Sequence, residues 1–195
     1  KKKKKKKKKN KIYFLKKLPE WFKNRALSWN QKQKINFIKS ICKEPNLHLV
    51  FKNKKDLQKI KTNYLKTSSC SLLIRKPLPI KEIYGYNEGL WWVQDFSAMM
   101  PLHLNNKIYN KLTADLCAAP GGKTFQLLNY GGKVEAFEKN KVRAKLMLEN
   151  LKRLNFNCKL TIQDVLTISS RKKFDLIVLD APCSSVGTIR RHPEI

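Results

Sequence analysis

Apolar and polar residues alternate in two ways along the second half of the chain. Short runs rich in Leu, Val, Ile and Ala are separated by longer segments in which apolar residues recur every three or four positions. The short runs predict strands and the longer segments predict helices, in the order strand 111–117, helix 121–128, strand 132–138, helix 141–154, strand 158–164 and strand 174–180. Because strands that alternate with helices form a parallel sheet covered by helices, we expect a Rossmann-like α/β fold.

The residues before this region follow a mixed pattern. Residues 18–41 and 54–65 carry apolar side chains at helical intervals, whereas 47–52 and 70–77 are short apolar runs typical of strands. We therefore expect a small α+β module over residues 11–106 and the Rossmann-like domain over residues 107–195. The run Lys1–Lys9 has nine like charges and no apolar face, so we expect residues 1–10 to be disordered.

The chain is strongly basic. Its 195 residues include 43 Lys and Arg against 14 Asp and Glu, a formal net charge of +29, and a large excess remains without the lysine run. This balance favours binding to a polyanion, with nucleic acid as the leading partner. An AT-rich genome, which favours lysine codons, is the alternative explanation of the same excess.

The cysteine pattern indicates neither a disulfide framework nor a metal site. Five cysteines are spread along the chain with no Cys-x-x-Cys pair and no His at zinc spacing, namely Cys42, Cys70, Cys117, Cys158 and Cys183. No apolar run approaches the roughly 20 residues that a helix needs to cross a bilayer. We therefore expect a soluble, cytoplasmic, monomeric protein that uses no metal and does not enter a membrane.

The stretch "DLCAAPGGKT", residues 115–124, ends like a triphosphate-binding loop, but Cys117 stands where that loop needs its first glycine. Three acids stand at the ends of three of the predicted strands, and the carboxyl ends of parallel strands are where such sheets bind ligands. These acids are Glu138, Asp164 and Asp180. They would repel a triphosphate but could accept ribose hydroxyls and an adenine amino group. We therefore expect a positively charged adenosine cofactor, S-adenosylmethionine.

Three stretches carry a family resemblance. The loop 115–124, "EGLWWVQDFSAMM" at 88–100 and "FDLIVLDAPCSSVGTIRRHPEI" at 174–195 together resemble the RNA cytosine-5 methyltransferase family (Sun/Fmu/NOP2-like), in particular its bacterial branch acting on 16S ribosomal RNA. The resemblance runs from about Leu18 to Ile195 and is dense after Gly85. It implies an S-adenosylmethionine-dependent methyltransferase sheet, C-terminally truncated, preceded by a small RNA-positioning module.

The resemblance also implies roles for individual residues. Glu138, where the family often has Asp, would take the ribose hydroxyls, Asp164 would face the adenine, and Asp180 would lie between the cofactor and the target cytosine. Arg190 and Arg191 would contact RNA phosphates. The methionine and sugar end of the cofactor would be wrapped by Cys117, Ala118, Ala119, Pro120, Gly121, Gly122 and Lys123.

The family's chemistry requires a cysteine, because attack of a thiolate on C6 of cytosine makes C5 able to accept a methyl group. The resemblance assigns this attack to a Thr-Cys motif on a later loop and assigns release of the product to Cys183. The sequence contains no Thr-Cys pair. We therefore expect part of a longer enzyme or an inactive truncated chain, of marginal stability because later strands would be missing.

Three functions fit these observations. The leading one is a 16S ribosomal RNA cytosine-5 methyltransferase. The second is a transfer RNA cytosine-5 methyltransferase, which shares the motifs seen here. The third is a catalytically inactive RNA-binding protein that keeps the cofactor pocket.

Overall fold

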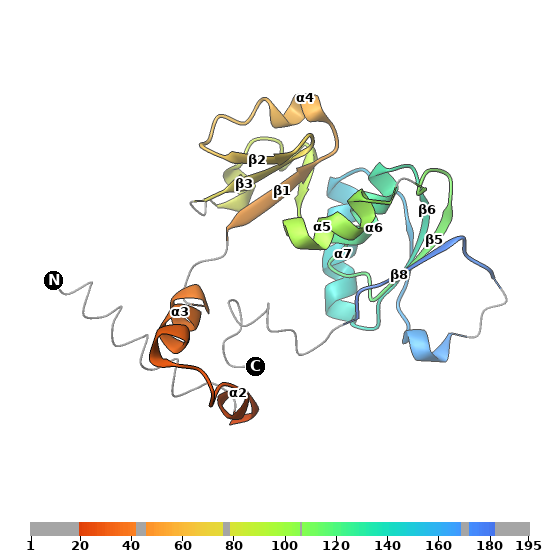
Figure 1. Ribbon diagram of the computed structural model, residues 1–195. Helices are drawn as coiled ribbons and strands as arrows, with labels where there is room; N and C mark the ends of the chain where they lie inside the picture. The colour runs from red at the N-terminus through yellow and green to blue at the C-terminus, as the bar shows by residue number, and fades with distance from the viewer. Residues whose placement is uncertain (1–19, 42–45, 76–78, 106, 169–171, 182–195) are drawn as a thin grey trace. The chain divides into compact units, whose positions relative to one another are not determined.

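The computed structural model describes residues 20–41, 46–75, 79–105, 107–168 and 172–181 (Figure 1). The chain divides into two compact units, one formed by residues 46–181 and the other by residues 1–45 together with 182–195. The predicted disordered start, residues 1–10, lies outside the described residues. The predicted boundary between residues 106 and 107 remains a prediction.

Two helices occupy the region where the sequence pattern extends over residues 18–41. They are α2 (Glu20–Arg25) and α3 (Gln31–Ile41). The break between them coincides with a reciprocal cap, because Asn30 Oδ1 accepts from the Gln33 amide at 2.9 Å and Gln33 Oε1 accepts from the Asn30 amide at 2.8 Å. This capping box satisfies free amides at the helix start, so the chain begins a new helix at Gln31.

A four-stranded antiparallel sheet opens the larger unit. Its order is β2-β3-β1-β4, and its strands are β1 (Leu47–Phe51), β2 (Leu65–Ser68), β3 (Ser71–Ile74) and β4 (Trp91–Val93). One face is covered by α4 (Lys54–Leu57) and by the segment that contains the short helix η1 (Ile80–Glu82). The core beneath them is apolar and is formed by Leu49, Phe51, Leu57, Ile60, Leu72, Ile74, Ile83 and Trp91.

The prediction of one helix over residues 54–65 is wrong. The helix α4 ends at Leu57, and Leu65 begins β2, where it pairs with Leu73 of β3. Leu57 and Ile60 are buried in the core of the small sheet, but a single turn, closed by the Ile60 amide on the Leu57 carbonyl, is enough to place both. Strand pairing then satisfies the backbone of residues 65–68, so tertiary structure overrides the helical spacing.

The second half forms the predicted parallel sheet with helices between its strands. Its order is β7-β6-β5-β8, with β5 (Leu112–Leu116), β6 (Lys133–Phe137), β7 (Lys159–Thr161) and β8 (Leu176–Leu179). The helices are α5 (Phe96–His103), α6 (Gly122–Asn129) and α7 (Lys141–Arg153), and a short helix η2 (Val165–Thr167) precedes β8. The α/β fold class is confirmed. The chain order reverses at β5, where such sheets bind their ligands.

The two faces of the parallel sheet differ. Alternate residues such as Val134 and Ala136 of β6 are buried against the three helices, in cores that include Phe125, Leu127, Met147 and Leu151. On the opposite face, two alternate side chains of β8 are exposed, Ile177 by 59% and Leu179 by 61%. Within the described residues β8 pairs only with β5. It is therefore an edge strand with apolar surface, the kind of edge that invites further pairing.

Buried polar groups join the small sheet to the helices of the parallel sheet. Gln94, which follows β4, accepts from Trp92 Nε1 at 2.8 Å and donates to Gln126 Oε1 of α6 at 2.8 Å. Arg153 of α7 donates to the carbonyls of Tyr86 at 2.8 Å and Trp91 at 3.1 Å. In Figure 1, α5 and α6 lie between the two sheets. These bonds fix the small sheet against the side of the unit that carries the loop 117–121.

None of the helices in the described part of the chain is long and apolar enough to span a membrane.

Substitution of Gly89 tests this junction. Gly89 has φ +63°, and a Cβ added there would lie 2.0 Å from the Arg153 carbonyl oxygen, whereas Gly131 has φ +79° but would meet only the ring of the exposed Tyr109 at 2.6 Å. Gly89→Ala should therefore lower the free energy of unfolding by about 3 kcal/mol or more, because backbone strain and a backbone clash add. Gly131→Ala carries the backbone strain together with a contact that the exposed Tyr109 ring can relieve by moving, so it should cost about 1 to 2 kcal/mol. Denaturant unfolding of both variants measures the difference in stability, and equal losses would contradict the close approach of Gly89 to the Arg153 carbonyl.

Candidate functional site

The loop 117–121 joins β5 to α6 at the reversal point of the sheet. Cys117 has φ +61° and Gly121 has φ +109°, so the chain turns sharply at both ends of the loop. The Ala118 amide bonds the Phe137 carbonyl at 2.9 Å, which ties the loop to the end of β6. An added Cβ at Gly121 would lie 2.2 Å from the Phe125 ring, so only glycine fits there.

Glu138 is the buried acid at the end of β6, and it is 4% exposed. Its Oε2 accepts from the Ala119 amide at 3.1 Å, and its Oε1 accepts from the Asn140 amide at 2.8 Å. Each carboxylate oxygen can accept a second hydrogen bond. Glu138 can therefore hold the loop in shape and still accept from a ligand hydroxyl.

Arg143 of α7 completes this corner. Its Nη1 lies 3.9 Å from Glu138 Oε2, and its Nη2 donates to the Ala119 carbonyl. The guanidinium thus compensates the buried charge of Glu138 and fixes a second polar group of the loop. The structure therefore gives Arg143 a specific role at the loop.

Asp164 lies at the next strand end. Its Oδ1 accepts from the Leu166 amide at 3.1 Å at the start of η2, and its Oδ2 accepts from Lys139 Nζ at 2.7 Å. The hydrogen bond from Lys139, followed by that from Leu166, lowers the pKa of Asp164 from its usual value. Lys139 immediately follows Glu138 in the chain. The two acids therefore stand at neighbouring strand ends, both ready to accept hydrogen bonds.

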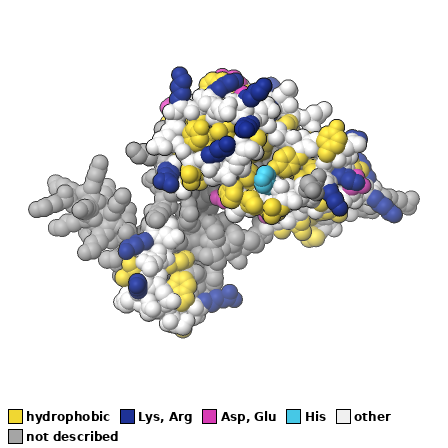
Figure 2. Space-filling view, turned by 45° about the horizontal axis from the view of Figure 1, so that its top comes forward, with side chains coloured by type: hydrophobic (Ala, Val, Ile, Leu, Met, Phe, Trp, Pro, Cys, Tyr) yellow, Lys and Arg dark blue, Asp and Glu magenta, His cyan; other side chains and the backbone are white. Residues whose placement is uncertain are grey.

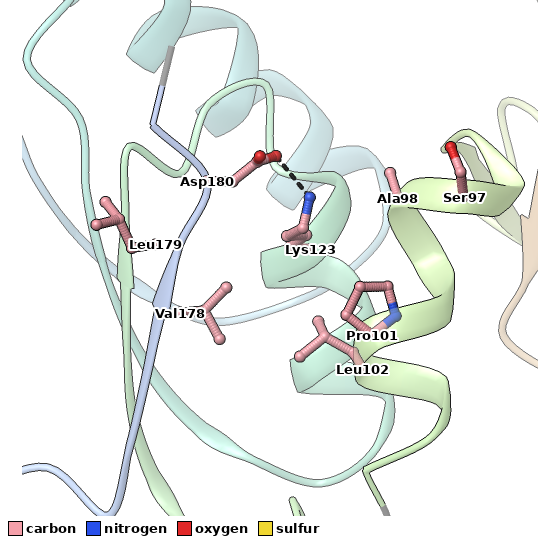
Figure 3. A pocket seen from close by; sticks show the side chains of 8 residues that line it. All are labelled: Ser97, Ala98, Pro101, Leu102, Lys123, Val178, Leu179 and Asp180. Carbon is pink, nitrogen blue, oxygen red and sulfur yellow. Dashed lines mark hydrogen bonds and ion pairs between the residues drawn. The ribbon is translucent and has the colours of Figure 1, made fainter. Parts of the chain in front are cut away.

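A cavity of about 420 Å³ lies beside the end of β8 (Figure 3). Its polar groups include an ion pair between Lys123 Nζ, at the start of α6, and Asp180 Oδ2, 2.5 Å apart. The Asp180 side chain is 64% exposed and that of Lys123 is 17% exposed. The other walls are mostly apolar and come from Ser97, Ala98, Pro101 and Leu102 of α5 and from Val178 and Leu179 of β8. This pocket can receive a flat, largely apolar group beside a paired acid and base.

Asp115 lies beneath the loop and is 1% exposed. Burial raises its pKa to about 6, against the lowering effect of a hydrogen bond from Thr124 Oγ1 and of the Lys123 charge. Its carboxyl group is held within the body of the unit, with Thr124 as its partner. Asp115 supports the start of α6 rather than facing solvent.

The structure brings together most of the residues expected from the sequence. The loop residues 117–123 and Glu138 form one corner, Asp164 follows at the adjacent strand end, and Asp180 joins through Lys123. Cys183, Arg190 and Arg191 lie outside the described residues, so their expected roles remain predictions. Among the described residues, no group of three or more His, Cys, Asp or Glu could hold a metal ion.

Sequence reasoning missed the buried amides behind the loop. Gln126 donates to the Met99 carbonyl at 2.9 Å while accepting from Gln94. Gly122, the first residue of α6, would bring an added Cβ to 3.4 Å from Gln94 Cγ. The one signal for these amides in the sequence was Gln94, a polar residue next to the apolar run of the segment "LWWVQD".

Comparison with solved structures defines the class. A methyltransferase homologue from Pyrococcus horikoshii superposes with a TM-score of 0.69 at 26% identity, covering 93% of this chain and 65% of that one. NSun6 from Pyrococcus horikoshii, solved with SFG, shares the fold with a TM-score of 0.67 at 19% identity, covering 87% of this chain and 72% of its own. The fold is that of the S-adenosylmethionine-dependent methyltransferases.

Sequence comparison points to one family within this class of methyltransferases. Residues 101–195 match the family of 16S rRNA methyltransferases RsmB/F. The ribosomal RNA small subunit methyltransferase B of Photorhabdus laumondii is 39% identical over 133 residues, which are 66% of this chain and 31% of the relative. A probable enzyme of the same name from Coxiella burnetii is 34% identical over 149 residues, 72% of this chain and 35% of the relative.

These matches confirm the family recognised from the sequence motifs. It is a family of RNA methyltransferases that use S-adenosylmethionine, as expected for the enzyme class and the cofactor. The chain spans about a third of the length of the two curated relatives.

The raised pKa of Asp115 predicts a pH dependence of stability. A carboxyl group whose pKa is about 6 in the folded state and near 3.8 when unfolded stabilises the fold fully below pH 3.8. That contribution is lost as the pH rises through about 6, a change of up to about 3 kcal/mol. Asp115→Asn keeps an acceptor for Thr124 but does not titrate, so the variant should gain in stability relative to the parent chain between pH 4 and pH 7. Thermal unfolding of both proteins over this range checks the prediction, and a constant difference would contradict it.

Proposed function

We propose that the protein is part of an enzyme that transfers a methyl group from S-adenosylmethionine to C5 of a cytosine in small-subunit ribosomal RNA. The observation that carries the proposal is the corner formed by the loop 117–121, Glu138 and Arg143, together with the family match over residues 101–195. The names of the relatives state the ribosomal RNA substrate. The choice of C5 of cytosine rests on the resemblance of the sequence motifs.

The donor and acceptor groups of the corner fit the cofactor. Glu138 keeps one acceptor position on each carboxylate oxygen for the ribose hydroxyls, and Asp164 offers an ionised carboxylate for the adenine amino group. Because the loop 117–121 turns at Cys117 and Gly121, its backbone can approach the cofactor closely. The cluster of carboxylates is compatible with a sulfonium cation and disfavours a triphosphate.

The target base would enter the cavity beside β8. When bound, S-adenosylmethionine supplies an electrophilic methyl group. Lys123 holds Asp180 by an ion pair at the mouth of this cavity, so Asp180 is oriented toward a base that enters between α5 and β8. The apolar side chains of Pro101, Leu102 and Val178 would exclude water from the face of the bound base.

Release of the methylated product is proposed for Cys183, by resemblance. The attacking thiolate belongs to a Thr-Cys motif in this family, and these 195 residues contain none. The 195-residue chain is therefore expected to bind the cofactor without turning it over. Arg190 and Arg191 are proposed to contact phosphates of the RNA.

Calorimetric titration with S-adenosylmethionine tests the cofactor site. Asp164→Ala removes the proposed adenine contact and should weaken binding by about tenfold or more, as expected for a hydrogen bond to a charged group. Glu149→Ala removes an exposed acid from α7 and serves as the matched control, with unchanged affinity. Binding that is equal in the parent chain and Asp164→Ala would contradict this adenine contact.

Methyl transfer to unmodified 16S ribosomal RNA is measured beside the titration. The 195-residue chain should bind S-adenosylmethionine and produce no 5-methylcytosine, because the attacking cysteine is absent from it. Formation of 5-methylcytosine by this chain would show that another of its cysteines makes the attack. A folded chain that does not bind the cofactor would overturn the proposal.

A further inference from the structure

A second cavity lies beside the small sheet and shares no residue with the strand-end site, which is the site formed by the loop 117–123, Glu138, Asp164 and Asp180. It has a volume of about 670 Å³ and is open to solvent between the turn at residues 59–62 and the segment 82–84. These two segments follow α4 and include the end of η1, so the cavity belongs to the layer that covers the small sheet. Its size is sufficient for one nucleotide. Nothing in the proposed methyl transfer uses it.

The floor of this cavity is apolar. Ile60 and Ile83 are buried in the core of the small sheet and close the bottom of the cavity. Tyr84 forms a wall and is 49% exposed. Its carbonyl accepts from the indole Nε1 of the buried Trp91 at 2.8 Å, which fixes the backbone that presents the ring. An aromatic ring held in this way is a ready stacking surface.

Two lysines and one acid stand at the rim of the cavity. Lys59 and Lys61 lie on one side and Glu82 lies on the other, and Lys59 Nζ donates to Asp56 Oδ1 at 3.0 Å. The hydrogen bond that Lys59 donates to Asp56, followed by the nearby Tyr84, raises the pKa of Lys59, so its ammonium group stays charged. More lysines are exposed on the surrounding surface, at Lys54, Lys55 and Lys81. Figure 2 shows Lys and Arg side chains in dark blue over the upper part of the molecule, with hydrophobic side chains between them.

We propose that this cavity binds one nucleotide of single-stranded RNA outside the methylation target, with its base stacked on Tyr84 and its phosphate contacted by Lys61 and Lys59. The inference rests on the proposed function, because it assumes an RNA substrate. An aromatic wall, an apolar floor and a lysine rim together match a base with its phosphate. A protein partner would need a larger continuous apolar surface than this cavity presents.

The contact would add affinity without reading sequence. Every base offers a flat face, so stacking on Tyr84 tolerates any base, and the lysines contact the backbone. The small module would thereby hold a flanking segment of the RNA while the target base occupies the cavity beside β8. This division separates anchoring of the substrate from selection of the base.

Fluorescence anisotropy with a labelled 12-nucleotide single-stranded RNA tests the proposal on the full 195-residue chain. Tyr84→Ala should weaken binding about tenfold, and Tyr84→Phe should keep the parent affinity because the ring remains. Lys61→Ala should weaken binding and reduce the dependence of affinity on salt by about one counterion. Tyr109→Ala, at an exposed tyrosine outside the cavity, is the matched control and should bind as the parent chain does.

Several results would overturn the proposal. Parent-like affinity of Tyr84→Ala, or an equal loss in Tyr84→Ala and Tyr109→Ala, would exclude a specific stack on Tyr84. An oligonucleotide with abasic sites that binds as tightly as the complete RNA would exclude the base contact. If Tyr84→Ala does not fold, as judged by its thermal midpoint, Tyr84→Leu replaces it, since this variant keeps an apolar wall without an aromatic ring.

The same samples separate this inference from the proposed function. Each variant is also titrated with S-adenosylmethionine, which should bind all of them equally, because Tyr84 and Lys61 lie outside the strand-end site. Cofactor binding with no effect of Tyr84 on RNA affinity would refute only the nucleotide cavity. A loss of RNA affinity in Tyr84→Ala, in a folded chain that does not bind the cofactor, would refute only the proposed methyl-transfer site.

Discussion

The buried carboxylate of Glu138 is the constraint on which the rest of the site depends. Glu138 directly follows β6. Its carboxylate accepts from the amides of Ala119 and Asn140 and lies near the guanidinium of Arg143, which itself donates to the Ala119 carbonyl. A buried charge is costly unless it is paired and hydrogen-bonded, so these partners act as a set and the loop 117–121 takes the one shape that satisfies them. The glutamate side chain is long enough for its carboxylate to accept from the Ala119 amide of the loop, although the residue itself lies at the end of the strand. The proposed cofactor site is therefore formed by the same interactions that stabilise the loop.

The small sheet supports this corner from behind. Gln94 and Gln126 form a buried amide pair that leads from β4 to α6, and Arg153 binds carbonyls on either side of the turn at Gly89. Buried polar groups of this kind specify one arrangement, because displacing either partner leaves the other without a hydrogen bond. The small sheet is thus part of the scaffold that positions the start of α6 and Lys123. The layer that covers its other face carries the cavity at Tyr84, for which we propose a contact with RNA.

The sequence predicted the elements whose apolar pattern is strong and local. The strands of the parallel sheet and the helices α6 and α7 lie where the alternation placed them, and Met147 and Leu151 of α7 are buried in the core. The helix expected up to Leu65 is wrong because pairing with β3 decided the structure of that segment. Arg143 could not be distinguished from a solvated arginine, because its partners come from a loop that is near only in the fold. Cys183 remains a prediction, since the described residues end before it.

The most direct test of the central claim is hydrogen exchange at the amides of Ala119 and Asn140, measured with and without S-adenosylhomocysteine. Both amides bond the Glu138 carboxylate, so the account predicts slow exchange in the parent chain and further protection when the ligand binds. In Glu138→Gln, where the side-chain amide group cannot accept as the carboxylate does, both amides should exchange faster and lose the protection given by the ligand. Exchange at these two amides that is fast in the parent chain, or unchanged by the ligand and by Glu138→Gln, would contradict the claim that this carboxylate forms the cofactor site.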